Sequence, residues 1–139
     1  MNDLSYEIFF GDDSRVKDLE KIRINDNNST YYLNLILEGK VLAIGCFYKE
    51  QLVGGAYVMN SFNALFIEHV FVKDEFQNNS LHIGSAIVNY ILNNKDIFDK
   101  YFGVCFKMCR LESRNKDSFY TRLGFKKEQN FLETMKKRL

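Results

Sequence analysis

The segment VKDEFQNNSLHIGSAIVNYIL, residues 72–92, decides the fold. It begins at the end of an apolar stretch, passes through a polar loop and enters a segment whose isoleucines recur at helical spacing. A helix N-terminus carries unpaired backbone N–H groups and a partial positive charge, so a strand, loop and helix in this order can bind a phosphate. The segment holds only one glycine, Gly84. The sequence therefore predicts an anion site whose loop is poor in glycine.

Length, composition and charge predict one domain without a polyanionic partner. The chain has 139 residues, of which 46% are hydrophobic, and this is enough for a single core. No internal repeat or linker occurs, so we expect one domain over residues 1–139. Lys and Arg number 19 against 18 Asp and Glu. This balance argues against nucleic acid or a membrane surface as a partner.

The N-terminus and the cysteines indicate a cytoplasmic protein. No run of about 18 apolar residues occurs, and MNDLSYEIFFGDD is acidic where a secretory signal is basic and then apolar. Cys46, Cys105 and Cys109 lie in apolar runs without metal-ligand spacing. We therefore expect buried free thiols rather than a disulfide or a metal site.

The hydrophobic pattern predicts the order of strands and helices. Strands are expected at residues 6–10, 41–48, 52–59, 64–72, 104–111 and 131–135, and helices near residues 14–24, 29–38, 83–93 and 117–123. Short polar turns join the three central strands, which is typical of an antiparallel meander. Asp12, Asp13 or Ser14 is expected to cap the first helix. The predicted fold class is α/β, with a mixed, mostly antiparallel central sheet flanked by helices.

Three segments, FIEHVFVKDEFQ, HIGSAIVNYIL and SRNKDSFYTRLGF, follow one another between residues 66 and 125. With them, residues 41–139 resemble the GCN5-related N-acetyltransferase (GNAT) family. The first segment is similar to the family's fourth strand and the turn after it, the second to its pyrophosphate loop and third helix, and the third to its "N…FY…LGF" ending. The resemblance implies a GNAT fold, acetyl-CoA as co-substrate, no metal, and direct transfer of an acetyl group to a primary amine in a ternary complex.

The loop before the helix departs from the family pattern, which places Gln or Arg first, then two residues, Gly, one residue, and Gly or Ala. Counted from the strand, the pattern puts Gln77 first and Ser80 and His82 at the small positions. Counted back from the helix, it puts Asn79 first and Gly84 last. The second count fits the apolar helix positions better, which implies two extra loop residues. Both counts put His82 in the place of a glycine.

The resemblance also assigns residues to the co-substrate. Backbone N–H groups within residues 79–85 are expected to contact the CoA phosphates, the N–H of Val70 to polarise the thioester carbonyl, and Val72 to pair with the pantetheine arm. The predicted set is Val70, Val72, Gln77, Asn79, Ser80, His82, Ile83, Gly84, Ser85 and Asn115. Asn115 lies two residues from the usual place of the family's Asn, so an ordinary helix cap is its alternative. The alternative for the loop is a helix entry capped by Ser80.

Glu68 is a lone carboxylate in an apolar strand. Burying a carboxylate without a partner is unfavourable, so it is either a general base whose pKa is raised by apolar neighbours or a partner in an ion pair. Strict alternation of side chains would put Glu68 on the same face as Val70 and Val72. His69 would then lie on the opposite face and would serve as base only if the strand register were shifted.

Tyr120, in SFYTRLGF, resembles the family's usual thiolate acid. Attack of an amine on acetyl-CoA expels a thiolate whose parent thiol has a pKa near about 8.5, so a phenol held nearby can protonate it. The alternative is a packed core aromatic. Two functions stay open, an N-acetyltransferase and a catalytically degenerate GNAT-fold binding or regulatory module. Glu68 and Tyr120 favour the enzyme, and His82 favours the module.

The acceptor amine is not identified by the sequence, because small molecules, peptides and proteins all present amines. By the resemblance, the helix near residues 29–38 takes the place of the family's substrate-facing second helix, so Tyr31, Tyr32 and Phe62 are candidates to line an acceptor cleft. Pairing through an exposed edge strand or an apolar patch would give a homodimer.

Overall fold

The central sheet has the predicted mixed, mostly antiparallel arrangement. The computed structural model describes residues 3–23, 31–61, 64–77, 80–103, 107–110, 122–127 and 135–138. Within these ranges the strands are β1 Leu4–Phe9, β2 Leu42–Tyr48, β3 Gln51–Ser61, β4 Ala64–Val72, β5 Lys107–Arg110, β6 Lys126–Lys127 and β7 Met135–Arg138. They pair in the order β1-β2-β3-β4-β5-β7-β6. The β4–β5 pairing is parallel and the others are antiparallel, so the predicted fold class is confirmed.

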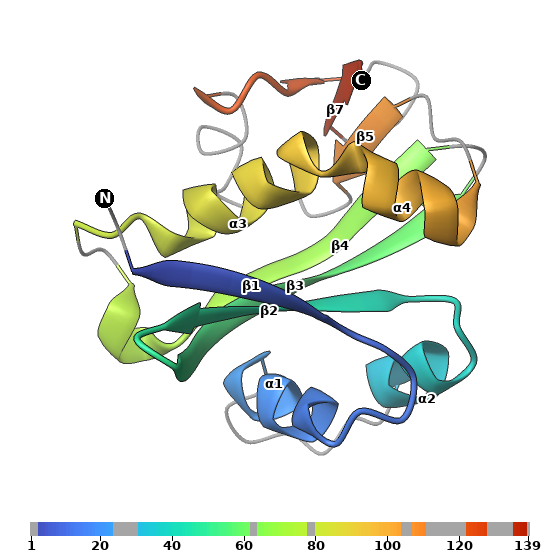
Figure 1. The fold of residues 1–139 in the computed structure, drawn as a ribbon. Helices are drawn as coiled ribbons and strands as arrows, with labels where there is room; N and C mark the ends of the chain where they lie inside the picture. The colour runs from blue at the N-terminus through green and yellow to red at the C-terminus, as the bar shows by residue number, and fades with distance from the viewer. Residues whose placement is uncertain are drawn as a thin grey trace.

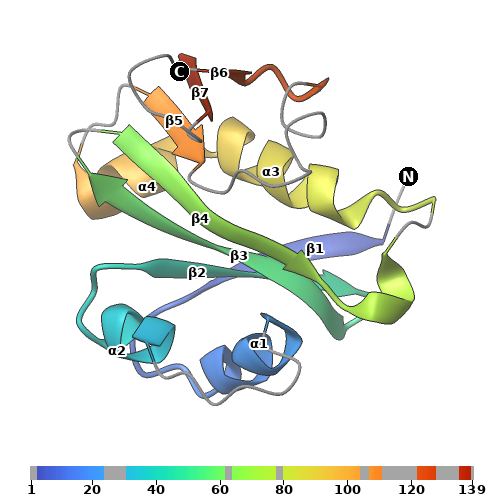
Figure 2. The ribbon, with the colours of Figure 1, turned by 180° about the vertical axis from the view of Figure 1, so that it is seen from behind.

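Helices cover both faces of the sheet. Helices α1, Arg15–Arg23, and α2, Tyr31–Leu37, lie on one face, and α3, Ile83–Asn93, and α4, Lys95–Phe102, lie on the other (Figure 1). The view from behind shows the same two layers (Figure 2). A short 3-10 turn, η1, Asp74–Phe76, follows β4. The sheet is therefore buried on both sides, which leaves its edges and the strand ends for function.

The predicted elements agree with the structure except at a few places. Helix α4 was not predicted, because a polar NNKD segment follows α3 directly and Phe98 is the only fully buried residue of α4. Strand β7 includes Lys136–Arg138, basic residues that lie beyond the predicted strand and pair with β5. The predicted helix at 117–123 and the strand residues 131–134 lie largely or wholly outside the described residues.

Two apolar clusters make up the core, one on each side of the sheet. The cluster under α3 and α4 contains Leu42, Ile44, Cys46, Val53, Ala56, Val58, Leu65, Ile67, Val70, Ile83, Ile87, Val88, Ile91, Phe98 and Phe125. The cluster under α1 and α2 contains Phe9, Val16, Leu19, Tyr32, Ile36, Val41, Ala43 and Tyr57. Cys46 is a buried free thiol, as predicted. Cys105 lies outside the described residues, and the Cys109 side chain is not described.

Close packing of α1 on the sheet depends on Gly55 in β3. A Cβ atom at this position would lie 2.3 Å from the carbonyl oxygen of Ile44 and 2.6 Å from Cδ1 of Leu19. Such contacts are far shorter than van der Waals separation. Glycine at this position therefore lets α1 approach the strands that carry the site.

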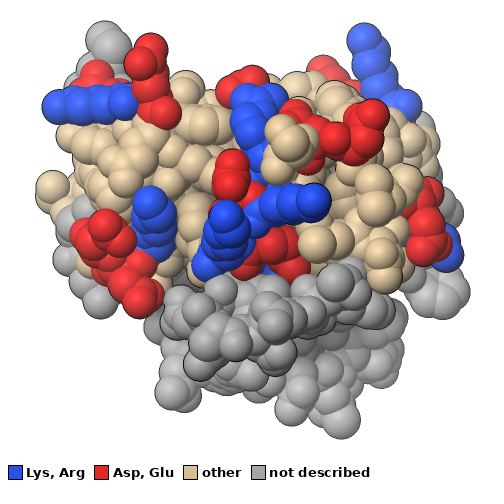
Figure 3. Space-filling model, turned by 90° about the horizontal axis from the view of Figure 1, so that it is seen from below, with Lys and Arg blue, Asp and Glu red and all other residues tan. Residues whose placement is uncertain are grey.

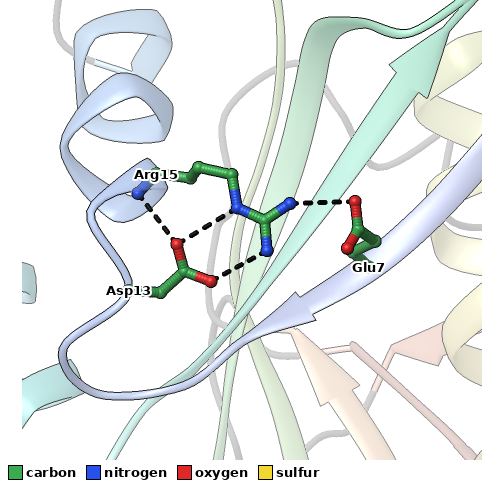
Figure 4. A network of polar contacts seen from close by, with 3 residues as sticks. All are labelled: Glu7, Asp13 and Arg15. Carbon is green, nitrogen blue, oxygen red and sulfur yellow. Dashed lines mark hydrogen bonds and ion pairs between the residues drawn. The ribbon is translucent and has the colours of Figure 1, made fainter.

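Helix α1 is joined to β1 by a small polar network (Figure 4). Of the three predicted caps Asp12, Asp13 and Ser14, it is Asp13 whose carboxylate accepts a hydrogen bond of 2.9 Å from the backbone N–H of Arg15. The Arg15 side chain donates to the same carboxylate and, at 2.9 Å, to Glu7 of β1. These pairs are solvent-exposed and contribute little to stability, but they fix where α1 begins.

Candidate active site

The described pairing of β4 with β5 covers Ala64–Ile67, whereas β4 continues to Val72. Over the described ranges, no strand pairs with the remainder of β4 on the β5 side. The second half of β4 therefore has backbone groups on that side for which no partner strand is described.

Two N–H groups in the second half of β4 point away from β3. The N–H of Lys73 donates a 2.8 Å hydrogen bond to the carbonyl of Val53 in β3. Because successive N–H groups of a strand point to opposite sides, those of Val70 and Val72 point away from β3, toward the side of β5. These are the two residues that the sequence assigns to the thioester and the pantetheine arm.

A β-bulge lies at Glu68, directly after the part of β4 that pairs with the described residues of β5. Tyr57 of β3 pairs with His69 and Val58 pairs with Ile67, so Glu68 is the extra residue. Side chains do not alternate strictly across a bulge. The prediction that Glu68 shares a face with Val70 and Val72 is therefore wrong.

Because of the bulge, the residues next to Glu68 lie on different faces of the sheet. Ile67 and Val70 both join the core under α3, whereas His69 contacts the ring of Tyr32 in α2, with centroids 5.3 Å apart. Glu68 has a side-chain hydrogen bond with the same Tyr32. Glu68 and His69 therefore both approach α2, and the shifted register keeps His69 as an alternative base.

The carboxylate of Glu68 is half-buried and incompletely paired. Its Oε2 atom is buried and has no hydrogen-bond partner in the described part of the chain. Burial raises the pKa of Glu68, while the adjacent His69 and the hydrogen bond with Tyr32 oppose the rise. No ion pair of Glu68 occurs among the described residues. This environment suits a group that exchanges a proton.

A polar cluster that the sequence did not reveal lies next to Glu68, between α1, α2 and β3. Glu20 is 5% exposed and accepts hydrogen bonds from the Tyr57 hydroxyl and from two nitrogens of Arg23, at 2.7 and 3.1 Å for the latter. The guanidinium of Arg23 lies 4.8 Å from the ring centroid of Tyr32. Glu20 stands four residues after the buried Val16, so its place on the core face of α1 was the available signal.

The loop between β4 and α3 only partly matches its predicted roles. The Gln77 amide donates a 2.8 Å hydrogen bond to the carbonyl of Val72, so Gln77 closes the turn after β4. Asn79 lies outside the described residues. Ser80 is exposed and is not the N-cap, because α3 begins at Ile83 and His82 precedes it. The alternative of a helix entry capped by Ser80 is therefore wrong.

His82 has the backbone conformation that favours glycine. Its φ is 50° and its ψ is 51°, in the left-handed region, where a side chain costs about 1–2 kcal/mol. The imidazole makes no capping hydrogen bond. The interpretation that His82 stands in the place of a glycine thus has a structural basis.

The first turn of α3 offers backbone donors close to the end of β4. The His82 carbonyl accepts the first helical hydrogen bond, from Ala86, so the N–H groups of Ile83, Gly84 and Ser85 have no acceptor within the helix. The helix is anchored because the Ile83 side chain is buried in the core. Ile87 lies over Gly54, the β3 residue that pairs with Val72. The helix N-terminus and the end of β4 are therefore adjacent.

Besides Asn79, two predicted site residues cannot be placed. Tyr120 and Asn115 lie outside the described residues. The chain is described again from Arg122, and Gly124 has a φ of 97°, as expected where a helix ends. Phe125 is buried in the core under α3.

A hollow lies on the α1 side of the molecule, away from Glu68 and the N-terminus of α3. It has a volume of about 530 Å³ and is lined by Arg15, Asp18, Lys21, Ile22, Phe47, Glu50, Gln51, Leu52, Lys73, Asp74 and Glu75. Charges of both signs are interspersed in the view of Figure 3, so this lining favours no single ligand charge.

Within the described ranges, no cluster of three or more His, Cys, Asp or Glu side chains is arranged to hold a metal ion. None of the described helices is long and apolar enough to cross a membrane.

The fold is that of the GNAT acetyltransferases. A GNAT family acetyltransferase from Elizabethkingia anophelis, solved with acetyl-CoA bound, matches over 100% of both chains with a TM-score of 0.71 and 16% identity. The IAA acetyltransferase of Bacillus cereus matches over 98% of this chain and 99% of its own, with a TM-score of 0.72 and 10% identity. The PaiA N-acetyltransferase of Thermoplasma acidophilum, in complex with coenzyme A, matches over 97% and 99%, with a TM-score of 0.60 and 19% identity.

These similarities extend the resemblance to the whole chain. The sequence motifs cover residues 41–139 only, whereas the structural matches include the N-terminal strand and helices. No family model matches the sequence, and no curated protein matches it. Because the identities are below 20%, the comparisons establish the fold, and the activity is argued from the site.

Proposed function

We propose that the chain is an acetyl-CoA-dependent N-acetyltransferase that moves an acetyl group directly to a primary amine in a ternary complex. The observation that carries the proposal is the N-terminus of α3, whose first N–H groups have no acceptor within the helix, next to the end of β4, where the Val70 and Val72 N–H groups point away from β3. An extended arm can pair with such strand N–H groups, while an anion meets the helix N-terminus. Structures of this fold with acetyl-CoA or coenzyme A bound give further support.

In this proposal, each described residue of the site would contact or support one part of acetyl-CoA. Val72 would pair with the pantetheine arm, and the Val70 N–H would donate to the thioester carbonyl oxygen. The N–H groups of Ile83, Gly84 and Ser85 would bind the phosphates. Gln77 would act indirectly, by holding the turn, and Ser80 and His82 would border the phosphate site. Asn79 and Asn115 stay predictions.

The proposed chemistry requires three proton transfers. Glu68 would accept one proton of the acceptor's ammonium group, and the amine nitrogen would then attack the thioester carbon. The Val70 N–H would stabilise the negative charge that develops on the carbonyl oxygen. When the carbon–sulfur bond breaks, Tyr120 would protonate the departing thiolate, and the second proton that the nitrogen loses would return to the Tyr120 phenolate. The products are the N-acetylated amine, the CoA thiol and one proton, which Glu68 releases to solvent.

A test of co-substrate binding uses Gly84→Glu in the first turn of α3. A carboxylate there would occupy the phosphate position and repel it, while an acidic residue near a helix N-terminus is favourable for the helix. We expect calorimetry to show acetyl-CoA binding to the wild type and none to Gly84→Glu, with both proteins folded. Asn89→Glu is the matched control, because it adds the same charge to an exposed position of the same helix, and it should bind normally.

Unchanged affinity in Gly84→Glu would contradict the proposed phosphate site. Absence of binding to the wild type would favour the second candidate, a GNAT-fold binding or regulatory module. The strained His82 at the helix entrance is the specific observation in favour of that candidate.

A further inference from the structure

A continuous series of contacts leads from α1 to the carboxylate of Glu68. Tyr32 of α2, which is 9% exposed, is at its centre. Its ring packs against the ring of Tyr57 at 5.0 Å and is met edge-on by His69 at 5.3 Å. The Arg23 guanidinium lies over it at 4.8 Å. These contacts leave the phenol of Tyr32 little freedom to rotate or shift.

The residue that covers Tyr32 is itself fixed. Arg23 forms a two-pronged hydrogen-bonded pair with Glu20, and the Tyr57 hydroxyl donates to the same carboxylate. A buried ion pair is weak evidence for stability, because removing charges from water is costly. Its two-pronged geometry does, however, hold a guanidinium in one orientation. The pair therefore orients Arg23 against Tyr32 more than it stabilises the fold.

The two oxygens of Glu68 have different surroundings. Tyr32 has a hydrogen bond with the carboxylate, yet Oε2 is buried and has no partner in the described part of the chain. An unpaired buried carboxylate oxygen is unfavourable unless a donor arrives. The ammonium group of an acceptor amine is such a donor.

We propose that Tyr32 is a positioning residue for Glu68, which holds the carboxylate so that Oε2 faces the acceptor's ammonium, and that the Glu20–Arg23 pair keeps Tyr32 in place. This inference rests on the proposed function, in which Glu68 is the general base. The titratable or charged groups around Glu68 in the described residues are Tyr32 of α2, His69 of β4 and, behind Tyr32, the Glu20–Arg23 pair of α1 and Tyr57 of β3.

The test compares Tyr32→Phe with the wild type in an acetyl-transfer assay. Phenylalanine keeps the ring packing and removes the hydroxyl that favours the charged carboxylate. We expect kcat/KM for the amine to fall about tenfold and the acid limb of its pH profile to move up by about one pH unit, as for the loss of a hydrogen bond to a charged group. Acetyl-CoA affinity should not change. Tyr101→Phe, which removes a hydroxyl from a partly exposed ring on α4, is the control and should match the wild type.

The outcomes separate the inference from the proposed function. If the wild type transfers acetyl groups and Tyr32→Phe has the same rate and pH profile, the positioning role is wrong and the enzyme assignment stands. If the wild type transfers no acetyl groups, the positioning role and the enzyme assignment are both wrong.

If Tyr32→Phe does not fold, Arg23→Lys tests the same contacts, since it keeps the charge and loses the two-pronged pair. An upward shift of the acid limb in Arg23→Lys would support the inference, and an unchanged limb would overturn it.

Discussion

At the residue scale, the chemistry of Glu68 depends on its position in a bulge. The extra residue in β4 turns the carboxylate toward Tyr32 and leaves one oxygen buried without a partner in the described chain. The sequence shows Glu68 as a lone carboxylate in an apolar strand, but strict alternation of side chains put it on the wrong face of the sheet. The bulge arises from the pairing of β4 with β3, so no pattern within residues 64–72 alone announces it.

The raised pKa of Glu68 gives a prediction about pH. Because only the charged carboxylate accepts a proton, kcat/KM should fall as pH drops through the pKa of Glu68, which lies above its ordinary value of 4.5. Glu68→Gln should lower kcat by roughly 10²–10⁴ and remove this limb.

The raised pKa of Glu68 affects folding stability in the opposite direction, because it favours the folded state at low pH. The contribution of Glu68 to folding is present below the ordinary pKa and is lost as pH rises through the folded-state pKa.

A pH–rate series on Glu68→Gln and His69→Gln checks this assignment. Loss of the acid limb in His69→Gln, with the limb kept in Glu68→Gln, would make His69 the base.

Tyr120→Phe gives a second prediction at this scale. If the phenol protonates the departing thiolate, the variant loses an interaction made mainly in the transition state, so kcat should fall by roughly 10²–10⁴ while KM for acetyl-CoA hardly changes. Steady-state kinetics with both substrates varied measures the two constants. Full kcat in the variant would make Tyr120 a packing residue and leave the acid to water or another group.

At the element scale, helix α3 and the loop that enters it differ in how far the sequence predicts them. The helix itself was predictable, because Ile83, Ile87 and Ile91 recur at helical spacing, and all three are buried. Its entrance was predictable only as a departure from the family pattern, with His82 in a glycine's place. Helix α4 was missed, because its first turn is polar and only Phe98 is fully buried.

His82→Gly tests the entrance of α3. Glycine adopts the left-handed conformation of His82 without steric strain, so the free energy of unfolding should rise by about 1 kcal/mol, measured by urea denaturation. His82→Ala is the matched control, since it removes the imidazole but keeps the strain, and should give no such gain. Acetyl-CoA affinity should be equal or higher in His82→Gly. A clear loss of affinity in both variants would mean that the imidazole itself contacts the ligand.

At the scale of the whole molecule, the fold follows from patterns that are readable in the sequence. The alternating central strands and the amphipathic helices specify two apolar clusters on either side of one sheet, and very different sequences form the same fold. The acceptor side of the site was less predictable. The Glu20, Arg23 and Tyr57 contacts join α1 to β3 across 37 residues of chain. Local spacing signals only Glu20, by its place on the core face of α1, and residue type does not distinguish Arg23 and Tyr57 from surface charges and core aromatics.

Acetyl transfer to an amine tests the central claim most directly. The wild type should be incubated with acetyl-CoA and a panel of primary amines, among them polyamines, amino acids, peptides and aminoglycosides, with release of the CoA thiol and the mass of each amine followed together. We predict thiol release that depends on at least one amine and is matched by an equal amount of its N-acetylated product. Thiol release at the same slow rate with and without every amine, and no acetylated product, would contradict the claim.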